Sequence, residues 1–410
     1  PYLIAHGLGK PVADASASAE IKDAGSYRIW VRTLDWTKRL GRPSGAGTFE
    51  LLVNGKKIGG TDYGYLGFEA DISDDAALNK IRITSSANRI ASQNPLAVSK
   101  AEVYVTDQAG NKTIFKEGTV LGTYLPPVGF VGKTGSTYKL FVKTLTGKQY
   151  ESVEEKMIAA PEIDNIVTQF EVRDQYDKVD ARRNGFSVFV DFKDSPQEGE
   201  FYMWNWKHYE KISICETCEG GATWNFKTNV CVSPRVPTED ILNYMCDGNC
   251  WSISTNNDLN VFSDVLTNGQ RIVGRQVARL PFDGYSPYYL RLEQRSITKN
   301  AFNFYQSLIA QVQSSGSLFD VPAETRFSIN VKPITDPKEK VLGIFNVFSV
   351  RKKIYFIDRF KLAPKDEFAQ ITYLTGEIYT CPPGSVNCQD RVPCVESPYR
   401  TKITPEGWNL

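Results

Sequence analysis

Histidine and methionine are the scarcest residues in this chain of 410 amino acids, with two histidines, His6 and His208, and three methionines. An imidazole is the usual base beside a serine nucleophile, and it is a common metal ligand. Neither a Gly-x-Ser-x-Gly motif nor a Gly-x-x-x-x-Gly-Lys-Ser/Thr phosphate loop occurs. These absences argue against serine hydrolases and P-loop enzymes. We predict a protein that is not an enzyme, with no catalytic residue, cofactor or metal ion.

An excess of charge of either sign is also missing, because 48 basic and 47 acidic side chains leave a net charge of +1. Proteins that bind nucleic acid usually carry a basic face, so we expect no nucleic-acid partner. Apolar runs such as residues 341–348 fall well below the roughly 20 residues that a membrane-spanning helix needs. The chain begins with Pro1. We therefore expect membrane contact only through a lipid anchor outside this sequence.

Cysteine is absent from the first half of the chain and concentrated in the second. An even number of cysteines in segments rich in glycine and asparagine is typical of a disulfide framework made in an oxidising compartment. The sequence leaves their pairing open. The disulfide candidates are Cys215, Cys218, Cys231, Cys246, Cys250, Cys381, Cys388 and Cys394.

A structural zinc ion is the alternative reading of four of these cysteines. The pairs Cys215–Cys218 and Cys246–Cys250 have spacings that a zinc site allows. However, Cys231 then lies unexplained between them, and three further cysteines remain in the tail. The disulfide interpretation is favoured. His208 precedes this region, and we expect it to be half-exposed at the end of a strand.

Residues 1–62 have the pattern of a small β module. Residues 26–33 alternate, with Tyr27, Ile29 and Val31 on one face. Residues 48–53 lead into Asn54-Gly55, a dipeptide typical of a tight hairpin turn, and a second strand is expected at 56–58.

A second β unit is expected over residues 63–160. Short apolar runs recur about every ten residues with turn sequences between them, which is typical of an immunoglobulin-like sandwich. The expected strands are residues 65–72, 81–84, 101–106, 112–116, 138–144 and 149–152. A linker is expected to begin at Pro161.

The main domain is expected over residues 161–375 and is again rich in strand patterns. One amphipathic helix is predicted near 297–315, capped by Ser296 and ended by Gly316. A single helix among strands indicates a helix packed on a sheet. Residues 376–410 are predicted to be an irregular tail that disulfides hold in place. The fold class is therefore mainly β.

Aromatic residues are the candidates for a ligand or partner surface. In residues 201–206, alternation puts Tyr202, Trp204 and Trp206 on one face, where they would stack on sugar rings or a partner. An ordinary sandwich core is the favoured alternative. Tyr285, Tyr288 and Tyr289 form a second group around a Ser-Pro turn.

Several segments, taken in order, resemble a Bacteroidota outer-membrane lipoprotein family known as domain of unknown function 4249. The resemblance covers about residues 65–410, and the stretch 290–297 leading into the helix is its most distinctive part. The matching segments are residues 98–111, 132–142, 147–152, 161–164, 290–297, 316–320 and 341–345, and the cysteine-containing tail. The resemblance implies an immunoglobulin-like sandwich followed by a larger β-rich domain, and no catalytic residues come with it.

The front of the chain departs from that family. Residues 1–12, 25–33 and 47–53 instead resemble a β module found attached to FAD-dependent oxidoreductases. No Gly-x-Gly-x-x-Gly fingerprint accompanies it, so we expect neither flavin nor redox activity. Such modules resemble carbohydrate-binding sandwiches, which keeps glycan binding open.

The family resemblance implies a lipid-anchored protein of the outer-membrane surface, acting as a binding or lid subunit of a SusC-like, TonB-dependent β-barrel transporter. The alternative is a glycan-binding or adhesive surface protein without a transporter, and the ligand would be a glycan or a peptide. A hydrolase that uses carboxylates is a third hypothesis. It rests only on the 47 acidic residues, because no acidic pair stands out by its pattern.

Overall fold

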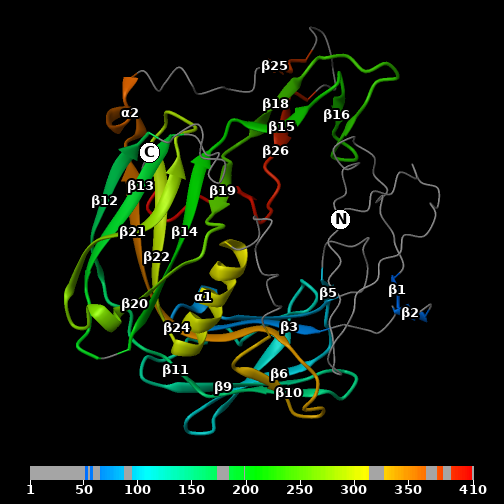
Figure 1. The fold of residues 1–410 in the computed structure, drawn as a ribbon. Helices are drawn as coiled ribbons and strands as arrows, with labels where there is room; N and C mark the ends of the chain where they lie inside the picture. Colours follow the sequence, from blue (N-terminus) through cyan, green and yellow to red (C-terminus); the bar gives the residue numbers. More distant parts are fainter. Residues whose placement is uncertain are drawn as a thin grey trace.

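The computed structural model describes residues 51–53, 56–58, 65–86, 95–172, 184–197, 199–313, 327–365, 376–381 and 389–408. Strands dominate them, and the prediction of a mainly β fold with one packed helix is confirmed (Figure 1). Two α-helices occur in these ranges, the long α1 (Lys299–Gln313) and the single-turn α2 (Arg359–Leu362). Neither helix has the length and hydrophobicity to cross a bilayer.

The first sandwich lies at the bottom of Figure 1. Its strands alternate between buried and more exposed side chains, as in β9 (Thr137–Lys143), where every second residue is buried. The inward side chains form one core that includes Phe68, Tyr124 and Leu140. One layer contains β3 (Leu66–Ser73), β4 (Lys80–Ser85), β5 (Leu96–Ala97) and β8 (Thr123–Leu125), and the other β6 (Glu102–Asp107), β7 (Lys112–Glu117), β9 (Thr137–Lys143), β10 (Gln149–Ser152) and β11 (Glu155–Lys156).

Two strands from much later in the chain complete this sandwich. Strand β23 (Val331–Pro333) pairs antiparallel with β10, and β24 (Leu342–Ile357) pairs parallel with β3. Phe345 and Val347 of β24 are buried in the core of the first sandwich. Segments on both sides of the boundary expected near residue 160 therefore build the same sheets.

Strand β24 is shared by two sandwiches. Residues 342–348 pair with β3, and residues 349–357 pair antiparallel with β22. At the change-over, the carboxylate of Asp74 accepts hydrogen bonds from the Ser349 hydroxyl at 2.6 Å and the Val350 amide at 2.9 Å. Asp74 follows β3 directly, so its carboxylate holds β24 at the point where the strand leaves the first sandwich.

The second sandwich packs two antiparallel layers around an aromatic and aliphatic core. The smaller layer contains β12 (Ile163–Glu171), β13 (Gly185–Lys193) and β21 (Arg271–Pro281). The larger layer contains the second half of β24 with β22 (Tyr288–Ile297), β14 (Phe201–Lys211), β19 (Trp251–Thr255), β20 (Asn260–Ser263) and β27 (Arg400–Thr401). Both faces of β14 and β22 carry buried side chains, because one face meets the core of the second sandwich and the other meets α1.

Helix α1 covers the outer face of the larger layer, as Figure 1 shows. Ala301, Phe304 and Leu308 pack there against Phe201 and Phe348. The cap prediction was wrong. Ser296 still belongs to β22, and the Thr298 hydroxyl accepts from the Ala301 amide at 3.3 Å and caps the helix. Strand β22 continues through Ser296 and Ile297, two residues that the helical spacing had assigned to the start of the helix.

A small cysteine-rich sheet stands apart at the upper right of Figure 1. Strand β18 (Leu242–Asp247) is its centre and pairs antiparallel with β15 (Ile214–Cys218). The tail adds β25 (Glu377–Ile378) and β26 (Arg391–Pro393) in parallel, and β16 (Thr223–Asn225) and β17 (Val230–Val232) form a separate hairpin. The tail was expected to be irregular, but its described residues add strands to two sheets.

The hairpin expected at residues 48–58 is present in part. Strands β1 (Leu51–Val53) and β2 (Lys56–Ile58) pair antiparallel with Leu51 opposite Ile58. The strand expected at residues 26–33 lies outside the described residues, as does the rest of the small module.

Candidate functional site

The aromatic stripe of β14 divides between core and surface. Tyr202 is 0% and Trp204 is 1% exposed, and both pack in the core of the second sandwich. The core interpretation is therefore right for these two residues, and their use as an exposed ligand surface is wrong. Trp206 is only partly buried. It lies on β14 beside the gap between β19 and β20, and it lines a cavity of about 550 Å³.

The cavity forms where the neighbours of β14 change. Strand β20 pairs with residues 201–204 of β14, and β19 pairs with residues 207–211. The connection between them, residues 256–259, bulges away beside Trp206. Asn256 takes the place of a pairing strand there. Its side-chain oxygen accepts a hydrogen bond from the Trp206 backbone amide at 3.0 Å, and its backbone amide donates to the Trp206 carbonyl at 3.3 Å.

The walls of the cavity combine polar and apolar side chains. Asn256, Asn257 and Asp258 contribute one wall, and β21 contributes Arg275 and Gln276 to the other. The Asn260 side-chain amide donates to the Gln276 carbonyl at 3.0 Å and so joins the two walls. The remaining lining residues are Thr255, Leu259, Val277, Ala278, Arg279 and Pro281.

Arg275 is the most constrained cation of this cavity. Its guanidinium lies 5.5 Å from the Trp204 ring and 5.1 Å from the Phe262 ring, and Nη2 donates to Asn260 Oδ1 at 2.8 Å. Its Nε–H is buried and has no hydrogen-bond partner. Burial lowers the pKa of Arg275, although arginine stays charged at any physiological pH. Arg275 lines the cavity, and a partly buried guanidinium favours an acceptor-rich ligand.

The pocket beside Trp206 therefore combines an indole edge, several side-chain amides and a partly buried guanidinium. An indole can stack on the apolar face of a sugar ring, while amides and arginine donate hydrogen bonds to hydroxyl or carboxylate oxygens. Pockets of this size hold small polar molecules. The arrangement suits recognition of a hydroxyl-rich or acidic ligand.

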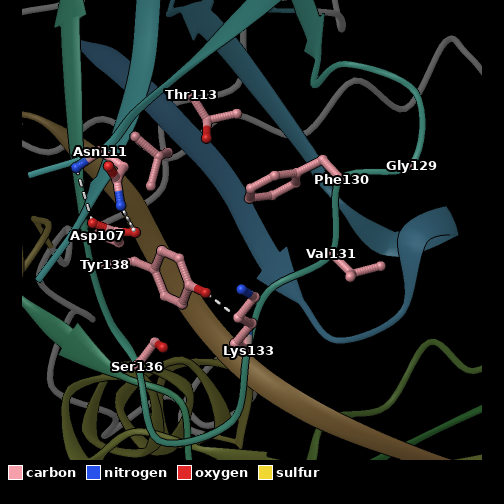
Figure 2. Close-up of a pocket in the computed structure, with 10 residues that line it drawn as sticks. Asp107, Asn111, Thr113, Gly129, Phe130, Val131, Lys133, Ser136 and Tyr138 are labelled. Carbon is pink, nitrogen blue, oxygen red and sulfur yellow. Dashed lines mark hydrogen bonds between the residues drawn. The ribbon is translucent and has the colours of Figure 1, made fainter. Parts of the chain in front are cut away.

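A smaller cavity of about 300 Å³ lies in the first sandwich between β6, β9 and the loop before β9. Figure 2 shows that its polar groups bind one another. The Tyr138 hydroxyl accepts from the Lys133 amide at 2.7 Å, and the Asn111 side-chain amide donates to Asp107 at 2.9 Å. These hydrogen bonds hold turns in place, so we assign the cavity a structural role.

The second aromatic group is not a surface either. Tyr288 is 3% and Tyr289 is 0% exposed, so the prediction of a partner surface there is wrong for both. Tyr285 is partly buried and packs against the core of the second sandwich. Tyr289 stacks on Trp408 of the tail at 5.7 Å and donates its hydroxyl proton to the Glu406 carbonyl at 2.8 Å.

Tyr288 belongs to a buried ionic cluster that the sequence did not reveal. It stacks on His208 at 3.5 Å, and the guanidinium of Arg359 lies 5.3 Å from its ring. Arg359 is 0% exposed, and it pairs with Glu210 at 2.7 Å and with Asp283 at 2.9 Å. His208 is 5% exposed, not half-exposed as expected, because the cluster and the Tyr289 carbonyl cover it.

The ionisation of this cluster follows from its contacts. Burial by itself would raise the pKa of Glu210. Hydrogen bonds from His208 and Ser286, together with the charge of Arg359, outweigh burial and lower that pKa to about 2. For Asp283, burial outweighs the attraction of Arg359 and raises the pKa. Glu210 is thus a fixed counter-ion of Arg359, which is a structural role.

The cysteines form disulfides, which confirms the cross-link prediction over the zinc alternative. Cys215 is bonded to Cys246, Cys218 to Cys231, and Cys250 to Cys394. Cys381 is also in a disulfide, and none of the described cysteines is a free thiol. Cys388 lies outside the described residues.

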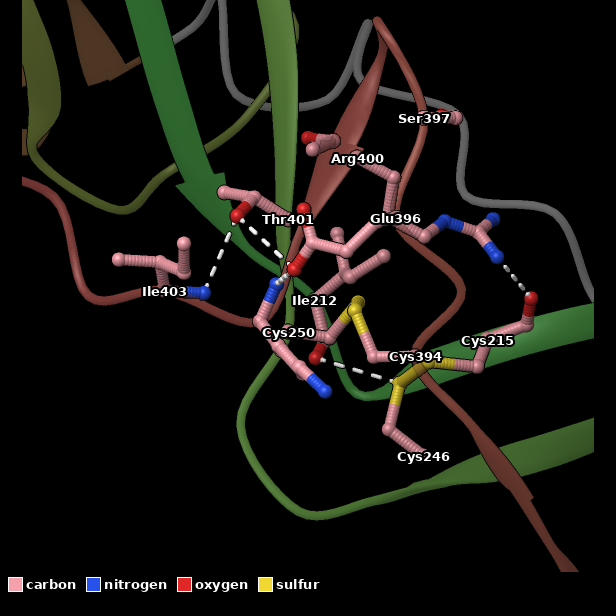
Figure 3. The surroundings of a disulfide bond; sticks show 12 residues. Ile212, Cys215, Cys246, Cys250, Cys394, Glu396, Ser397, Arg400, Thr401 and Ile403 are labelled. Carbon is pink, nitrogen blue, oxygen red and sulfur yellow. Dashed lines mark hydrogen bonds between the residues drawn. A yellow bond between two sulfur atoms is a disulfide. The ribbon is translucent and has the colours of Figure 1, made fainter. Parts of the chain in front are cut away.

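Figure 3 shows how one of these bonds secures the tail. The Cys250–Cys394 bond joins the start of β19 to the segment after β26, next to the Cys215–Cys246 bond. Arg400 donates to the Cys215 carbonyl at 2.7 Å, and Glu396 accepts from the Lys402 amide at 2.7 Å. The tail thus bridges the cysteine-rich sheet and β27 of the second sandwich.

Asn256, Asn260 and Arg275 were missed by the sequence analysis. The polar run at residues 255–260 between two strands was the available signal, because a hydrophilic connection inside a sheet edge often carries function. Arg275 gave no signal, since it lies in an alternating strand like any exposed arginine.

The comparisons with known proteins identify a family for this chain. The chain matches the family described as domain of unknown function (DUF4249) over residues 61–354, well over half of its length. No curated protein and no solved structure matches it. The protein belongs to the DUF4249 family.

Proposed function

We propose that this protein is a lipid-anchored protein of the outer-membrane surface of a Bacteroidota cell. In this proposal it serves as the binding or lid subunit of a SusC-like, TonB-dependent transporter complex. The observation that carries the proposal is the set of disulfides, since such cross-links persist in oxidising compartments and are rare in the cytosol. The resemblance of the chain to surface lipoproteins supports the transporter partnership.

The pocket beside Trp206 supports the binding role within that complex. A capture subunit needs a polar, partly enclosed site that faces solvent, and exposed residues such as Asn257 and Asp258 form the rim of this pocket. The guanidinium of Arg275 lines this pocket and favours ligands rich in oxygen acceptors. A transporter beneath the subunit would receive the ligand from such a site.

The transporter partnership is tested by affinity purification of the tagged chain from its native membranes in mild detergent. We expect a large β-barrel protein to copurify in a fixed ratio, identified by mass spectrometry. Cells with the untagged chain provide the control for non-specific recovery. Isolation of the chain as a free monomer under several mild detergents would contradict the proposal.

Glycan binding without a transporter is the second candidate function, and the indole of Trp206 in a polar pocket favours it. A glycan array tests this candidate directly. Trp206→Ala should weaken any binding about tenfold or more, which corresponds to about 1.4 kcal/mol. Trp224→Ala is the matched control, because Trp224 is also partly buried but lies in the separate β16–β17 hairpin. Equal binding by both variants would place the ligand elsewhere.

A further inference from the structure

Three acidic side chains meet inside the second sandwich, away from the pocket and from the Arg359 cluster. Asp194 follows β13, Glu200 precedes β14, and Asp264 begins the short 3-10 helix after β20. They are 2%, 3% and 0% exposed. One carboxylate oxygen from each lies within 4.8 Å of the others.

Few donors face these carboxylates. The Tyr202 hydroxyl lies within hydrogen-bond distance of both Asp194 and Glu200, yet it has one proton to give. The Gly269 amide donates to Asp194 at 2.9 Å. No lysine, arginine or histidine forms an ion pair with any of the three acids in the described part of the chain. Two donors thus serve three buried acids.

Asp264 is the unpaired member of this group. Its backbone is satisfied, because its amide donates to the Glu200 carbonyl at 3.2 Å and its carbonyl accepts from the Thr267 amide at 2.6 Å. Both of its carboxylate oxygens are buried and have no hydrogen-bond partner. An unpaired buried carboxylate costs several kcal/mol unless a proton or a cation neutralises it. Asp264 therefore points to a missing positive charge.

A divalent cation meets this requirement better than a proton. A proton on Asp264 would leave two neighbouring acids to share one tyrosine hydroxyl, whereas a divalent ion neutralises two charges and binds oxygens from all three. A pure set of carboxylate oxygens is typical of hard cations.

We propose that Asp194, Glu200 and Asp264 bind a calcium ion. Calcium tolerates irregular geometry and carboxylates that bind through one or both oxygens, while magnesium usually keeps several water ligands. Ligands with at most 3% exposure leave little room for water, which favours calcium. Sites outside the cell usually bind calcium in the range of about 10⁻⁴–10⁻³ M.

The ion would join two connections that are distant in sequence. One connection runs from β13 to β14 and contains Asp194 and Glu200, and the other runs from β20 to β21 and contains Asp264. The Asp194 amide already donates to the Gln270 carbonyl at 3.1 Å across them. The ion would stabilise this end of the second sandwich, and the inference does not depend on the proposed function.

Terbium luminescence tests the site, because terbium occupies calcium sites and Tyr202 lies beside two of the proposed ligands. We expect terbium emission on excitation of the intact protein's aromatic residues, and its displacement by calcium. Asp264→Asn should reduce terbium affinity at least tenfold. Glu154→Gln, an exposed acid of the first sandwich, is the control and should change nothing.

Thermal unfolding of the wild-type protein gives a second readout that needs no variant. We expect calcium to raise Tm by about 2 °C or more relative to a chelator, and Asp264→Asn or Glu200→Gln to remove this rise. If the acids only share protons, calcium will leave Tm unchanged and Asp264→Asn will raise Tm equally with and without it. That result, or equal terbium binding by wild type and Asp264→Asn, would overturn the proposal.

Discussion

A single buried guanidinium organises one end of the second sandwich. Arg359 is 0% exposed and bonds to Glu210, Asp283 and Ser286. Removal of one partner from a buried ion pair is more damaging than replacement of the whole pair, because the remaining charge stays buried without compensation. A single substitution in this cluster should therefore lower the stability of the fold.

Arg359→Met should lower the free energy of unfolding by about 1.5–3 kcal/mol, because Glu210 and Asp283, which are 31% and 45% exposed, would lose their charged hydrogen-bond donor. Urea denaturation measures the change. Arg82→Met is the control, because Arg82 is 46% exposed and pairs with Glu69, which is 65% exposed. It should cost about 1 kcal/mol or less. Equal costs for the two variants would contradict the buried-charge argument.

The depressed pKa of Glu210 predicts a loss of stability in acid. A carboxyl that has a lower pKa in the folded state stabilises the fold above its unfolded pKa, and this contribution disappears as the pH falls through the folded value. For Glu210 the window runs from the ordinary value of 4.5 to about 2. Glu210→Gln should be less stable than wild type at pH 7, by about 1–3 kcal/mol. The difference should shrink below pH 3, as denaturation at both pH values would show.

Glycine is required at position 343 for two reasons that can be separated. Gly343 has φ +83°, and a Cβ there would lie 1.9 Å from the Phe68 carbonyl oxygen of β3. Gly110 has nearly the same φ, +82°, but nothing lies within 4 Å of its Cβ position. Gly110→Ala should cost about 1–2 kcal/mol through backbone strain alone. Gly343→Ala should cost about 3 kcal/mol or more, measured by thermal denaturation, because the β3–β24 pairing must also move. Similar costs would show that the contact with β3 yields easily.

At the scale of elements, the disulfides are unequal because they close loops of different length. The Cys218–Cys231 bond spans 13 residues, whereas the Cys250–Cys394 bond spans 144. The entropy of loop closure gives about 3 kcal/mol for the short loop and about 5 kcal/mol for the long one.

Replacement of both cysteines of a bond by alanine avoids leaving a free thiol. The Cys250→Ala/Cys394→Ala protein should be less stable than the Cys218→Ala/Cys231→Ala protein by about 2 kcal/mol in urea denaturation without reductant. It should also lose protection of β26 and β27 from hydrogen exchange, since the tail then loses its covalent link to the start of β19 and these strands are short. The opposite order of stability would show that strain or residual structure outweighs loop length.

Strand positions were predictable because their signal is local. Alternation at residues 101–106 and 138–144 matches β6 and β9, since one face of each strand meets the core of the first sandwich. The buried face of α1 was predictable for the same reason. The cap of α1 was not, because Ser296 and Thr298 are both good capping residues and pairing of β22 with β14 and β24 decided between them.

At the scale of the whole molecule, β24 makes the two sandwiches interdependent. Its residues Phe345 and Val347 are buried in the first core, and Ile357 is buried in the second. Loss of this strand would remove pairing partners from both. The chain therefore cannot unfold one sandwich and keep the other intact without breaking β24.

We expect the two sandwiches to unfold in one cooperative transition. Hydrogen exchange in rising denaturant, followed by mass spectrometry, should give the same midpoint for peptides from β6 and β9 as for peptides from β13 and β21. Gly343→Ala should lower both midpoints together. Two separate midpoints, or a shift confined to the first sandwich, would contradict the shared-strand argument.

The candidate sites were less predictable than the fold. Trp206 was singled out from its alternation with Tyr202 and Trp204, but sequence alone could not tell that only Trp206 lies beside the gap between β19 and β20. Asp194, Glu200 and Asp264 are separated by up to seventy residues and follow no ligand spacing. They meet only because two connections end at the same end of the sandwich.

The sequence by itself determined the β class, the amphipathic helix and the oxidation of the cysteines, because side-chain periodicity and cysteine content act locally or through composition. Tertiary structure decided which cysteines are bonded and which aromatic residues are covered. It also decided that a late strand completes the first sandwich. These outcomes depend on contacts between residues far apart in the chain, and such contacts are fixed only when the sheets pack around a common core.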